Sequence, residues 1–383
     1  MNMMNTIKHE FPLRPDLVYL NHAAVGVWPR RTADAVKNFA EENMIQGATD
    51  YPKWMNTERE LRGRLKRLLN AASVDDIGLV KNTSEALSLI AYGLDWQSGD
   101  NIVSTNQEFP SNRMVWKSLQ AKGVELRLAE VSGDDPEAAI LALCNKRTRL
   151  LTVSSVQYGT GLRMNLDRLG AFCHTSGVLF CLDAIQSLGA LQFDAQACHA
   201  DFVVADGHKW MLGPEGLAVF YSRPEARDAL SLLQYGWHMA ERAGDFDATE
   251  WSPAAAARRF EPGSPNMLGI HALNASLSLL EEIGMAQVEA DVLSNAEAVM
   301  AWVKSNPELE LITPARPGRY AGIVTFRHLH LDDDGHANLY RRLMAGGMVC
   351  AHRAGGIRFS PHFYSDVSAL DAAWGRALND QRS

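Results

Sequence analysis

Short apolar runs alternate with helical patterns from residue 81 to residue 186 of this chain. The apolar runs have the length of buried strands, and the segments between them have helical periodicity. This alternation predicts an α/β fold built from βαβ units with mostly parallel strands. The expected strands are NIVST (101–105), VELRLAEV (124–131), RLLTVSSVQYG (149–159) and VLFCLDAIQ (178–186), and the expected helices are KNTSEALSLIAYGL (81–94), SNRMVWKSLQAKG (111–123) and NLDRLGAFCHTSG (165–177).

The pattern changes near residue 262, where the breaker cluster EPGSPN precedes a long amphipathic helix expected near residues 266–283. A smaller section of mixed α and β pattern follows. A chain of 383 residues is long enough for about two domains. We therefore predict a large domain over residues 15–285, which holds the mostly parallel central sheet, and a smaller C-terminal α+β domain over residues 286–383 together with residues 1–14.

Charge and composition limit the kinds of partner. The chain has 45 acidic and 37 basic residues, a net charge of -8 and no basic block, so we expect a small-molecule partner, with neither nucleic acid nor a membrane. The segment MNMMNTIKHEFPLRPD has charges and prolines where a signal peptide is apolar, and no later run has the length of a membrane span, which predicts a cytoplasmic protein. Five cysteines without metal-ligand spacing indicate reduced thiols.

Polar residues follow three of the expected strands directly. In doubly wound folds, ligands bind outside the carboxyl ends of the strands, where such residues converge if the strands are parallel neighbours. The next strand-like run after VLFCLDAIQ lies in FVVADGHKW (202–210). Its lysine stands between this run and the strand-like segment GLAVFY (216–221). The residues at these ends are Asp183 and Gln186, then Asp206, His208 and Lys209, and finally Ser155, Gln157 and Tyr158.

Lys209 across a cleft from Asp183 suits a Schiff base, because imine formation needs a desolvated amine near a carbonyl. Pyridoxal 5'-phosphate (PLP) would supply that carbonyl, and the carboxylate would keep its pyridine nitrogen protonated. For the phosphate, KNTSEALSL offers a helix start with Asn82 as N-cap and free backbone N–H groups near Thr83 and Ser84. Each feature alone is typical of an ordinary surface lysine, strand cap or capping box. Their combination at neighbouring strand ends favours a cofactor site.

The segment from CLDAIQ (181–186) to GLAVFY (216–221) resembles the core of the class V aminotransferases, the fold type I PLP enzymes that include cysteine desulfurases, kynureninases and isopenicillin N epimerase-like proteins. The resemblance spans nearly the whole chain. Further matching motifs are YLNHAAVG (19–26), NTSEALSLIA (82–91), QEFPSN (107–112), RRFEPGSPN (258–266) and GGIRFSPHFYSDVSALD (355–371).

The resemblance implies roles for the cofactor-binding residues. Lys209 forms the Schiff base and serves as acid and base at the substrate α-carbon, Asp183 pairs with the pyridinium, and Gln186 donates to the phenolic oxygen. Phe109 stacks on the ring where desulfurases use a histidine. Asp206 stands where many relatives have a phosphate-binding serine, and it either turns away or engages a neighbouring donor. The residues implied for the phosphate are Thr83, Ser84 and His208, with Gly263 and Ser264 supplied by the other subunit of a homodimer.

The resemblance also implies a substrate site for a small amino acid. Arg358 clamps its carboxylate in a bidentate manner, Arg353 assists, and His22 and Trp237 are candidate pocket residues. The interval between the two arginines is only RAGGIR, whereas in cysteine desulfurases a loop here carries the cysteine that accepts sulfur. Cys350 lies upstream and is expected to be a packed thiol.

The short interval disfavours a desulfurase that works through an enzyme persulfide. The sequence favours a C–S β-lyase acting on a cysteine-derived substrate. Transamination and isopenicillin N epimerase-like racemisation or epimerisation remain as alternatives, and QYGWHM (234–239) keeps a kynureninase-like hydrolase open. An alternative of another class is a catalytically silent binding module with the same fold.

Overall fold

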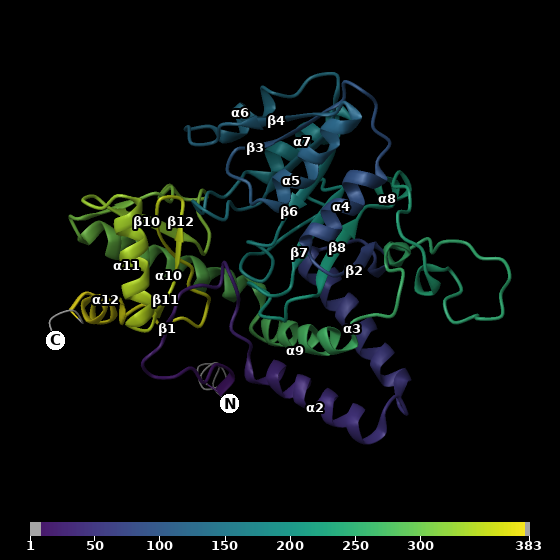
Figure 1. Ribbon diagram of the computed structural model, residues 1–383, viewed down its shortest axis with the longest axis horizontal. Helices are drawn as coiled ribbons and strands as arrows, with labels where there is room; N and C mark the ends of the chain where they lie inside the picture. The colour runs from purple at the N-terminus through teal and green to yellow at the C-terminus, as the bar shows by residue number, and fades with distance from the viewer. Residues whose placement is uncertain (1–8, 380–383) are drawn as a thin grey trace.

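The larger part of the protein is built around a seven-stranded sheet with the strand order β2-β8-β7-β6-β5-β3-β4 (Figure 1). The computed structural model describes residues 9–379. Strands β4, β3, β5, β6 and β7 run parallel, and β8 runs antiparallel to both β7 and β2. The strands are β2 (Ile77–Val80), β3 (Asn101–Thr105), β4 (Glu125–Ala129), β5 (Thr148–Ser154), β6 (Leu179–Asp183), β7 (Phe202–Asp206) and β8 (Ala218–Ser222). This confirms the predicted α/β fold with a mostly parallel central sheet.

Helices cover both faces of this sheet, so its central strands are apolar on both sides. Side chains alternate between the faces: Phe202 and Val204 of β7 join a core with α4 (Thr83–Gly93) and α5 (Ser111–Lys117). Val203 and Ala205 join a second core with α3, α7 and α9 on the other face. The remaining helices of this part are α2 (Arg30–Gln46), α3 (Tyr51–Leu69), α6 (Pro136–Leu141), α7 (Leu166–Ser176), α8 (Pro224–Asp228) and α9 (Met267–Ile283), with 3-10 turns η1 (Val74–Asp76), η2 (Ser118–Lys122), η3 (Trp237–Met239) and η4 (Ala257–Phe260).

Local chemistry explains where the predicted helices begin and end. The Asn165 side chain accepts a hydrogen bond from the backbone N–H of Arg168 and caps α7, which ends at Gly177 with φ 66°. The helix expected over residues 111–123 is instead the short helix α5 followed by the 3-10 segment η2. That segment ends at Gly123, whose φ is 77°.

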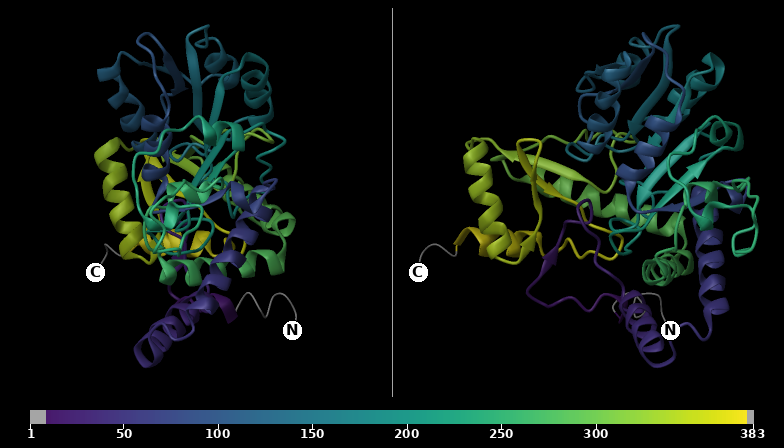
Figure 2. Two further views of the ribbon diagram at one scale, coloured as in Figure 1. Left: turned by 90° about the vertical axis from the view of Figure 1, so that its right-hand side faces the viewer. Right: turned by 45° about the vertical axis from the view of Figure 1, so that its right-hand side comes forward.

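The C-terminal part has its own antiparallel sheet, in the order β12-β13-β10-β9. Its apolar core includes Phe326 and Phe359 from the strands and Trp374 from a helix. Figure 2 shows this part beside the larger one. Its elements are α10 (Met285–Ser305), β9 (Leu309–Leu311), β10 (Val324–His328), α11 (Asp333–Ala345), β11 (Met348–Val349), β12 (Ala351–Arg353), β13 (Gly356–Phe359) and α12 (Leu370–Asn379).

The predicted domain division at residue 285 falls between α9 and α10 and stays a prediction. Strand β1 (Val18–Tyr19), which that division assigns to the large domain, pairs in parallel with β11 of the C-terminal part. Residues 1–8 and 380–383 of the predicted small domain lie outside the described residues. Within residues 9–379, no helix combines the length and the apolar character that a membrane crossing requires.

Candidate active site

A cavity of about 390 Å³ lies where β5, β6 and β7 end at their carboxyl edges. It brings together ten of the residues predicted for the cofactor and substrate. The lining residues are Ala23, Ala24, Asn82, Thr83, Ser84, Phe109, Ser111, Ser154, Tyr158, Asp183, Ile185, Gln186, Asp206, His208, Lys209, Arg353 and Arg358. The convergence follows from the parallel order of the strands, which carries their terminal residues to one edge of the sheet.

Lys209 lies three residues after β7 and is partly buried. Burial lowers the pKa of its amine to about 8, although the nearby Asp183 carboxylate opposes this shift. Its Nζ atom lies 5.7 Å from the centre of the Phe109 ring. About a tenth of Lys209 is therefore the free, nucleophilic amine at pH 7, far more than for an ordinary lysine.

The lowered pKa of Lys209 predicts the pH dependence of cofactor capture. Only the neutral amine attacks an aldehyde, and its fraction rises as the pH increases through about 8. Below that pH, we expect the rate constant for Schiff-base formation between PLP and the apoprotein to rise by about tenfold per pH unit, then to level off. Stopped-flow absorbance measures this rate. A rate that keeps rising beyond pH 10, as for an ordinary lysine, would contradict the expectation.

Asp183 ends β6 with both carboxylate oxygens hydrogen-bonded. Oδ1 accepts from the backbone N–H of Ile185 at 3.0 Å, and Oδ2 accepts from Asn112 Nδ2 at 2.7 Å. Burial raises the pKa of Asp183 to about 6, against the effect of these donors and of Lys209. A buried carboxylate of this kind is stabilised by a cationic partner, which fits the protonated nitrogen of a pyridine ring.

Gln186 is held in one orientation by Trp210. The Trp210 indole N–H, which can only donate, gives a 2.8 Å hydrogen bond to Gln186 Oε1. Gln186 Nε2 then donates to the backbone carbonyl of Ala23 at 3.1 Å. One further N–H of the same amide remains to meet an acceptor in the cavity, as the predicted contact with a phenolic oxygen requires.

The first turn of α4 forms a cradle for an anion. Asn82 caps the helix as predicted, because its side chain accepts from the Glu85 backbone N–H at 2.9 Å. The buried hydroxyl of Thr83 has no hydrogen-bond partner among the residues that the structure describes, and that of Ser84 donates to Ser111 at 2.9 Å. The orphaned hydroxyl and the free N–H groups of the first turn fit a phosphate group. The residues present therefore fit PLP at both its ring and its phosphate.

Arg358 is a buried cation with no acidic partner among the described residues. Its side chain is among the largest that are fully buried, and burial lowers its pKa to about 10. Nη1 donates to the Tyr158 carbonyl at 2.8 Å, and Nη2 makes a long contact of 3.4 Å with Asn21 Oδ1. Nε has no hydrogen-bond partner within residues 9–379. Such a guanidinium is suited to an incoming carboxylate. Arg353, in contrast, is exposed and donates to the carbonyl of His352.

The interval between the two arginines is a tight hairpin. Arg353 on β12 pairs with Gly356 on β13, so only Ala354 and Gly355 form the turn. Both have positive φ, 51° and 73°, as in the two-residue turns that match the twist of paired strands. This geometry leaves no loop that could reach into the cavity from this position.

Several predicted residues lie outside the cavity wall. His22 is buried behind it, where Nδ1 contacts the Ser360 carbonyl at 2.9 Å and Nε2 contacts the Tyr364 hydroxyl at 2.7 Å. The predicted pocket role of His22 is therefore not supported by its position: both ring nitrogens are engaged in the core. Ser155 lines a different hollow, and Gln157 donates inward to Glu108 at 2.8 Å.

Gly263 and Ser264 are exposed and also lie outside this chain's cavity, in a separate hollow. Contacts from two sides hold the segment that carries them. The Pro262 carbonyl accepts from the His238 backbone N–H at 3.3 Å, and Glu261 accepts from the Leu79 N–H of β2 at 2.8 Å. This segment is therefore fixed to the sheet edge, and its Gly263 and Ser264 do not line the cavity that contains Lys209 of the same chain.

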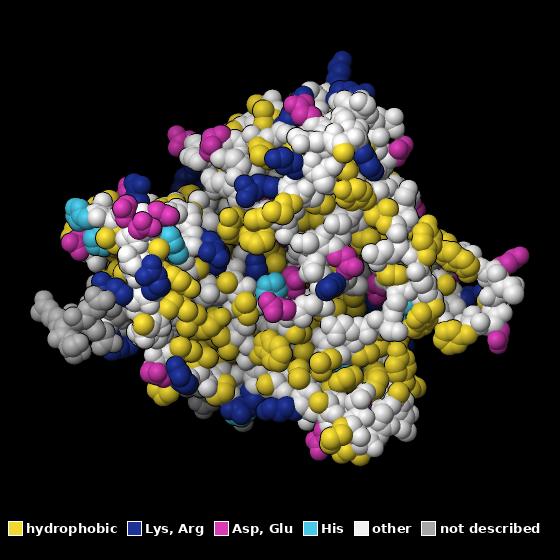
Figure 3. All heavy atoms as spheres, in the orientation of Figure 1, with side chains coloured by type: hydrophobic (Ala, Val, Ile, Leu, Met, Phe, Trp, Pro, Cys, Tyr) yellow, Lys and Arg dark blue, Asp and Glu magenta, His cyan; other side chains and the backbone are white. Residues whose placement is uncertain are grey.

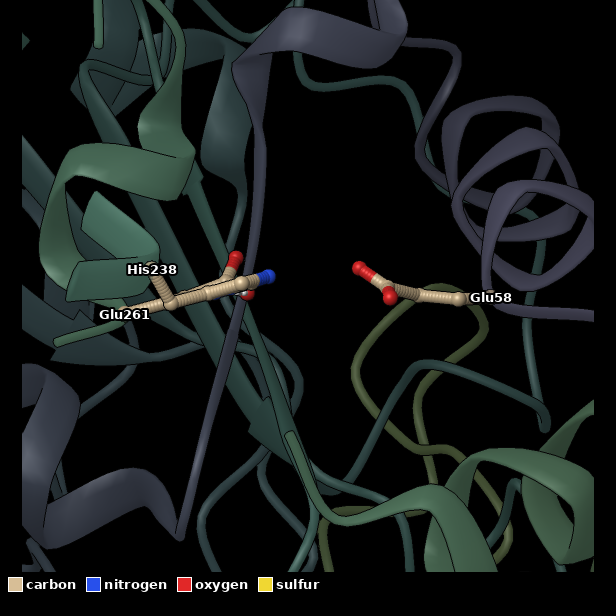
Figure 4. Close-up of side chains that lie close together, drawn as sticks. All are labelled: Glu58, His238 and Glu261. Carbon is tan, nitrogen blue, oxygen red and sulfur yellow. Dashed lines mark ion pairs between the residues drawn. The ribbon is translucent and has the colours of Figure 1, made fainter. Parts of the chain in front are cut away.

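A buried ionic cluster, formed by Glu58, Arg62, His238 and Glu261, anchors this segment. Figure 4 shows the Glu58 carboxylate pointing from α3 towards His238 and Glu261. Arg62 donates to both carboxylates, at 3.1 Å to Glu58 Oε1 and at 2.8 and 2.7 Å to the two oxygens of Glu261. Burial disfavours the charge of Arg62, but the two carboxylates raise its pKa. Its guanidinium supplies the cation that this acidic cluster needs.

Removing that cation is expected to destabilise the protein. An Arg62→Met variant leaves two buried carboxylates unpaired, and we expect its free energy of unfolding to fall by about 3–5 kcal/mol. Chemical unfolding followed by circular dichroism measures this change. The matched control is Arg67→Met on the same helix, whose exposed pair with Glu281 is worth at most about 1 kcal/mol. Equal, small effects of both changes would contradict the anchoring role.

Two functional side chains in QEFPSN were not identified from the sequence. Asn112 holds Asp183, and Glu108 accepts from the Ser154 N–H at 2.9 Å and from Gln157 Nε2 at 2.8 Å. Burial raises the pKa of Glu108, and these donors oppose the shift. Glu108 thereby fixes the turn that carries Phe109 over the cavity. Their only sequence signal was membership of a motif already noted for its aromatic residue.

A partly buried lysine near a buried aspartate, with an anion cradle beside them, defines an enzyme site for a carbonyl cofactor. The chain belongs to the class-V aminotransferase family, whose model matches residues 18–372. This confirms the resemblance seen in the sequence. The family match makes the chain a PLP-dependent enzyme and argues against a silent binding module.

Individual relatives agree with this family. A probable cysteine desulfurase of Methanothermobacter thermautotrophicus is 30% identical over 380 residues, which cover 94% of this chain and 93% of the relative. A cysteine desulfurase of Dickeya dadantii is 31% identical over 370 residues, covering 91% and 88%. Among solved structures, the cystine C–S lyase C-DES in complex with its product, cysteine persulfide, matches with a TM-score of 0.88 at 21% identity, covering 96% of this chain and 99% of that one.

Proposed function

We propose that this enzyme is a PLP-dependent C–S β-lyase that acts on a small, cysteine-derived L-amino acid without an enzyme persulfide. The observation that carries the proposal is the two-residue turn between Arg353 and Gly356, beside the unpaired buried guanidinium of Arg358. The guanidinium fits an amino-acid carboxylate. The turn provides no cysteine-bearing loop to receive sulfur, so sulfur leaves on the product.

The lining residues would hold PLP in a defined way. Asp183 and Gln186 would bind the ring, Phe109 would contact its face, and Lys209 would form the Schiff base. The first turn of α4 would bind the phosphate through Thr83 and Ser84 together with His208, and the partner subunit's Gly263 and the partner subunit's Ser264 would complete the site. When bound, PLP supplies an electron sink that stabilises negative charge at the substrate α-carbon.

The chain's own residues would then carry the elimination. Arg358 holds the substrate carboxylate and so orients the α-C–H bond, and Lys209 Nζ accepts that α-proton. The Cβ–S bond breaks with its electron pair leaving on sulfur, which takes up a proton. With cystine as substrate, one water is consumed and the products are pyruvate, ammonia and cysteine persulfide, so no oxidant or reductant is required.

The cysteines support a route without an enzyme persulfide. None of the described residues that line the cavity is a cysteine. Cys350, the cysteine nearest in sequence to the two arginines, is buried, and burial raises its pKa to about 12, so it stays a thiol at neutral pH. The neighbour C-DES, named a cystine C–S lyase, shares the fold. Other relatives are named cysteine desulfurases, so the experiment has to identify the group that accepts the sulfur.

Product analysis tests this proposal directly. The purified enzyme is incubated with cysteine, cystine, kynurenine and alanine, with and without an added keto acid, and products are identified by mass spectrometry. We expect pyruvate and a sulfur product from cystine or cysteine without the keto acid. Turnover only with the keto acid would make the enzyme a transaminase, and alanine formed from cysteine, with sulfur retained on the protein, would make it a desulfurase.

We also propose a homodimer, because the predicted phosphate site needs Gly263 and Ser264 from a second copy. Part of the segment over residues 231–256 projects from the body (Figures 1 and 3), and the segment bears exposed aromatic side chains, with Tyr235 66% and Phe246 78% exposed. Exposed apolar side chains gathered on one projection are typical of an interaction site. Sedimentation of the holoenzyme should therefore give twice the chain mass, and a monomeric holoenzyme would contradict the shared site.

A further inference from the structure

Asp206 places a carboxylate in the wall of a cavity that is suited to a phosphate. It ends β7, is only 7% exposed, and lines the cavity together with Thr83 and Ser84. A carboxylate in this position would repel a phosphate dianion if it faced the phosphate alone. Its nearest ionisable neighbour, however, is His208, whose Nδ1 lies 2.9 Å from Asp206 Oδ1. This is an ion-pair distance, and neither atom makes a hydrogen bond with another described residue.

Whether the His208 ring can bind phosphate depends on which of its two nitrogens carry protons. A neutral ring with its proton on Nδ1, directed at Asp206, presents a lone pair on Nε2, which would oppose a phosphate oxygen. A ring protonated on both nitrogens can donate from Nδ1 to the carboxylate and from Nε2 to the phosphate. The donors of α4 at this end, the hydroxyls of Thr83 and Ser84 and the first-turn N–H groups, are all neutral.

We propose that Asp206 is a positioning residue that holds His208 as an imidazolium and aims its Nε2–H at the cofactor phosphate. This inference rests on the proposed PLP site. The pair presents a cation to the phosphate, while the negative charge of Asp206 is directed at Nδ1 of the same ring. Charge-assisted hydrogen bonds of this kind are about twice as strong as neutral ones.

The inference predicts that Asp206→Asn changes PLP affinity in opposite directions in the wild-type protein and in a His208→Ala variant. Equilibrium dissociation constants of PLP and of pyridoxal, which lacks the phosphate, are measured by absorbance titration of the full-length apoprotein. We expect Asp206→Asn to weaken PLP binding by about tenfold, the size of a weakened charge-assisted hydrogen bond, with pyridoxal affinity changed by less than about twofold. In a His208→Ala background, the same change should strengthen PLP binding, because the carboxylate then only repels phosphate.

The outcomes separate this inference from the proposed function. Tighter PLP binding by Asp206→Asn in both backgrounds would overturn the positioning role and leave the PLP site intact. Failure of the wild-type protein to bind PLP with greater affinity than pyridoxal would overturn the proposed phosphate site itself. Unchanged pyridoxal affinity shows that each variant retains the folded cavity.

A measurement on the wild-type holoenzyme does not depend on the folding of any variant. Nitrogen-15 NMR of histidine-labelled holoenzyme at about pH 7.5, where an ordinary histidine is neutral, reports whether both ring nitrogens carry protons. The His208 signals are assigned by their loss in His208→Asn. We expect both nitrogens of His208 to be protonated, and a neutral ring would overturn the inference.

Discussion

An alanine at position 209 is expected to abolish both cofactor attachment and turnover. Lys209 would form the Schiff base and also accept the α-proton, and its lowered pKa of about 8 suits both tasks. Loss of a positioned general base alone costs about 10²–10⁴ in rate, and loss of the covalent attachment adds to this. We therefore expect Lys209→Ala to lower kcat by at least about 10⁴-fold.

Absorbance of the lysine-bound cofactor and single-turnover kinetics measure the two losses separately. The matched control is Lys146→Ala, which removes an exposed lysine far from β7 in the sequence and should leave both signals unchanged. The fold should survive in Lys209→Ala, because the amine that is lost makes no hydrogen bond to any residue of the described part of the chain, and a small apolar side chain replaces it. Persistence of the bound-cofactor absorbance in Lys209→Ala would refute the assignment of this lysine.

Sequence patterns located the main groups of the site because those groups follow strands. Asp183 is the last residue of one buried run and Lys209 closely follows another, and the length and alternation of such runs are local properties. The parallel order of β6 and β7 then brings the two residues together. The N-cap at Asn82 is likewise local, since its partner is the N–H three residues ahead. These features need only short-range information and the rule for strand edges.

Contacts between residues far apart in the chain could not be predicted from the sequence. Asn112 and Asp183 are 71 positions apart, and Arg62 and Glu261 are 199 apart, so no periodicity links either pair. His22 shows the opposite failure: its motif marked it as a pocket residue, but contacts with Ser360 and Tyr364, more than 330 positions away, turn it into the core. Tertiary packing sets the direction of the His22 side chain, and this packing cannot be predicted from the pattern of a single sequence.

Arg358 should control substrate binding without controlling cofactor binding. Its guanidinium already carries the desolvation cost of burial and has an unpartnered Nε, so an incoming carboxylate gains a largely preorganised cation. Truncating one partner of a buried, hydrogen-bonded charge pair costs about 2–5 kcal/mol. For Arg358→Met, we therefore expect kcat/KM with the best amino-acid substrate to fall by about 10²–10³-fold, with PLP affinity unchanged.

The neighbouring strand of the hairpin provides a matched control for this prediction. Arg353→Gln removes the exposed arginine on the neighbouring strand, and we expect it to lower kcat/KM by less than about tenfold, because a cation in water is screened. Equal losses from both changes would contradict a dominant clamp at Arg358. Arg358→Lys keeps the charge but loses the planar fork, so its activity should lie between wild type and Arg358→Met.

The melting temperature of Arg358→Met provides a second test, because it is expected not to fall when substrate binding is lost. A buried cation without an acidic partner is unfavourable for folding, so the site retains it at a cost to the unliganded protein. Arg358→Met should therefore lose substrate binding while its melting temperature stays at or above that of wild type. A structural arginine would behave differently, since its loss would lower the melting temperature and activity together. Thermal unfolding of the substrate-free holoenzyme, measured beside kcat/KM, distinguishes a cation kept for a substrate carboxylate from one kept for the fold.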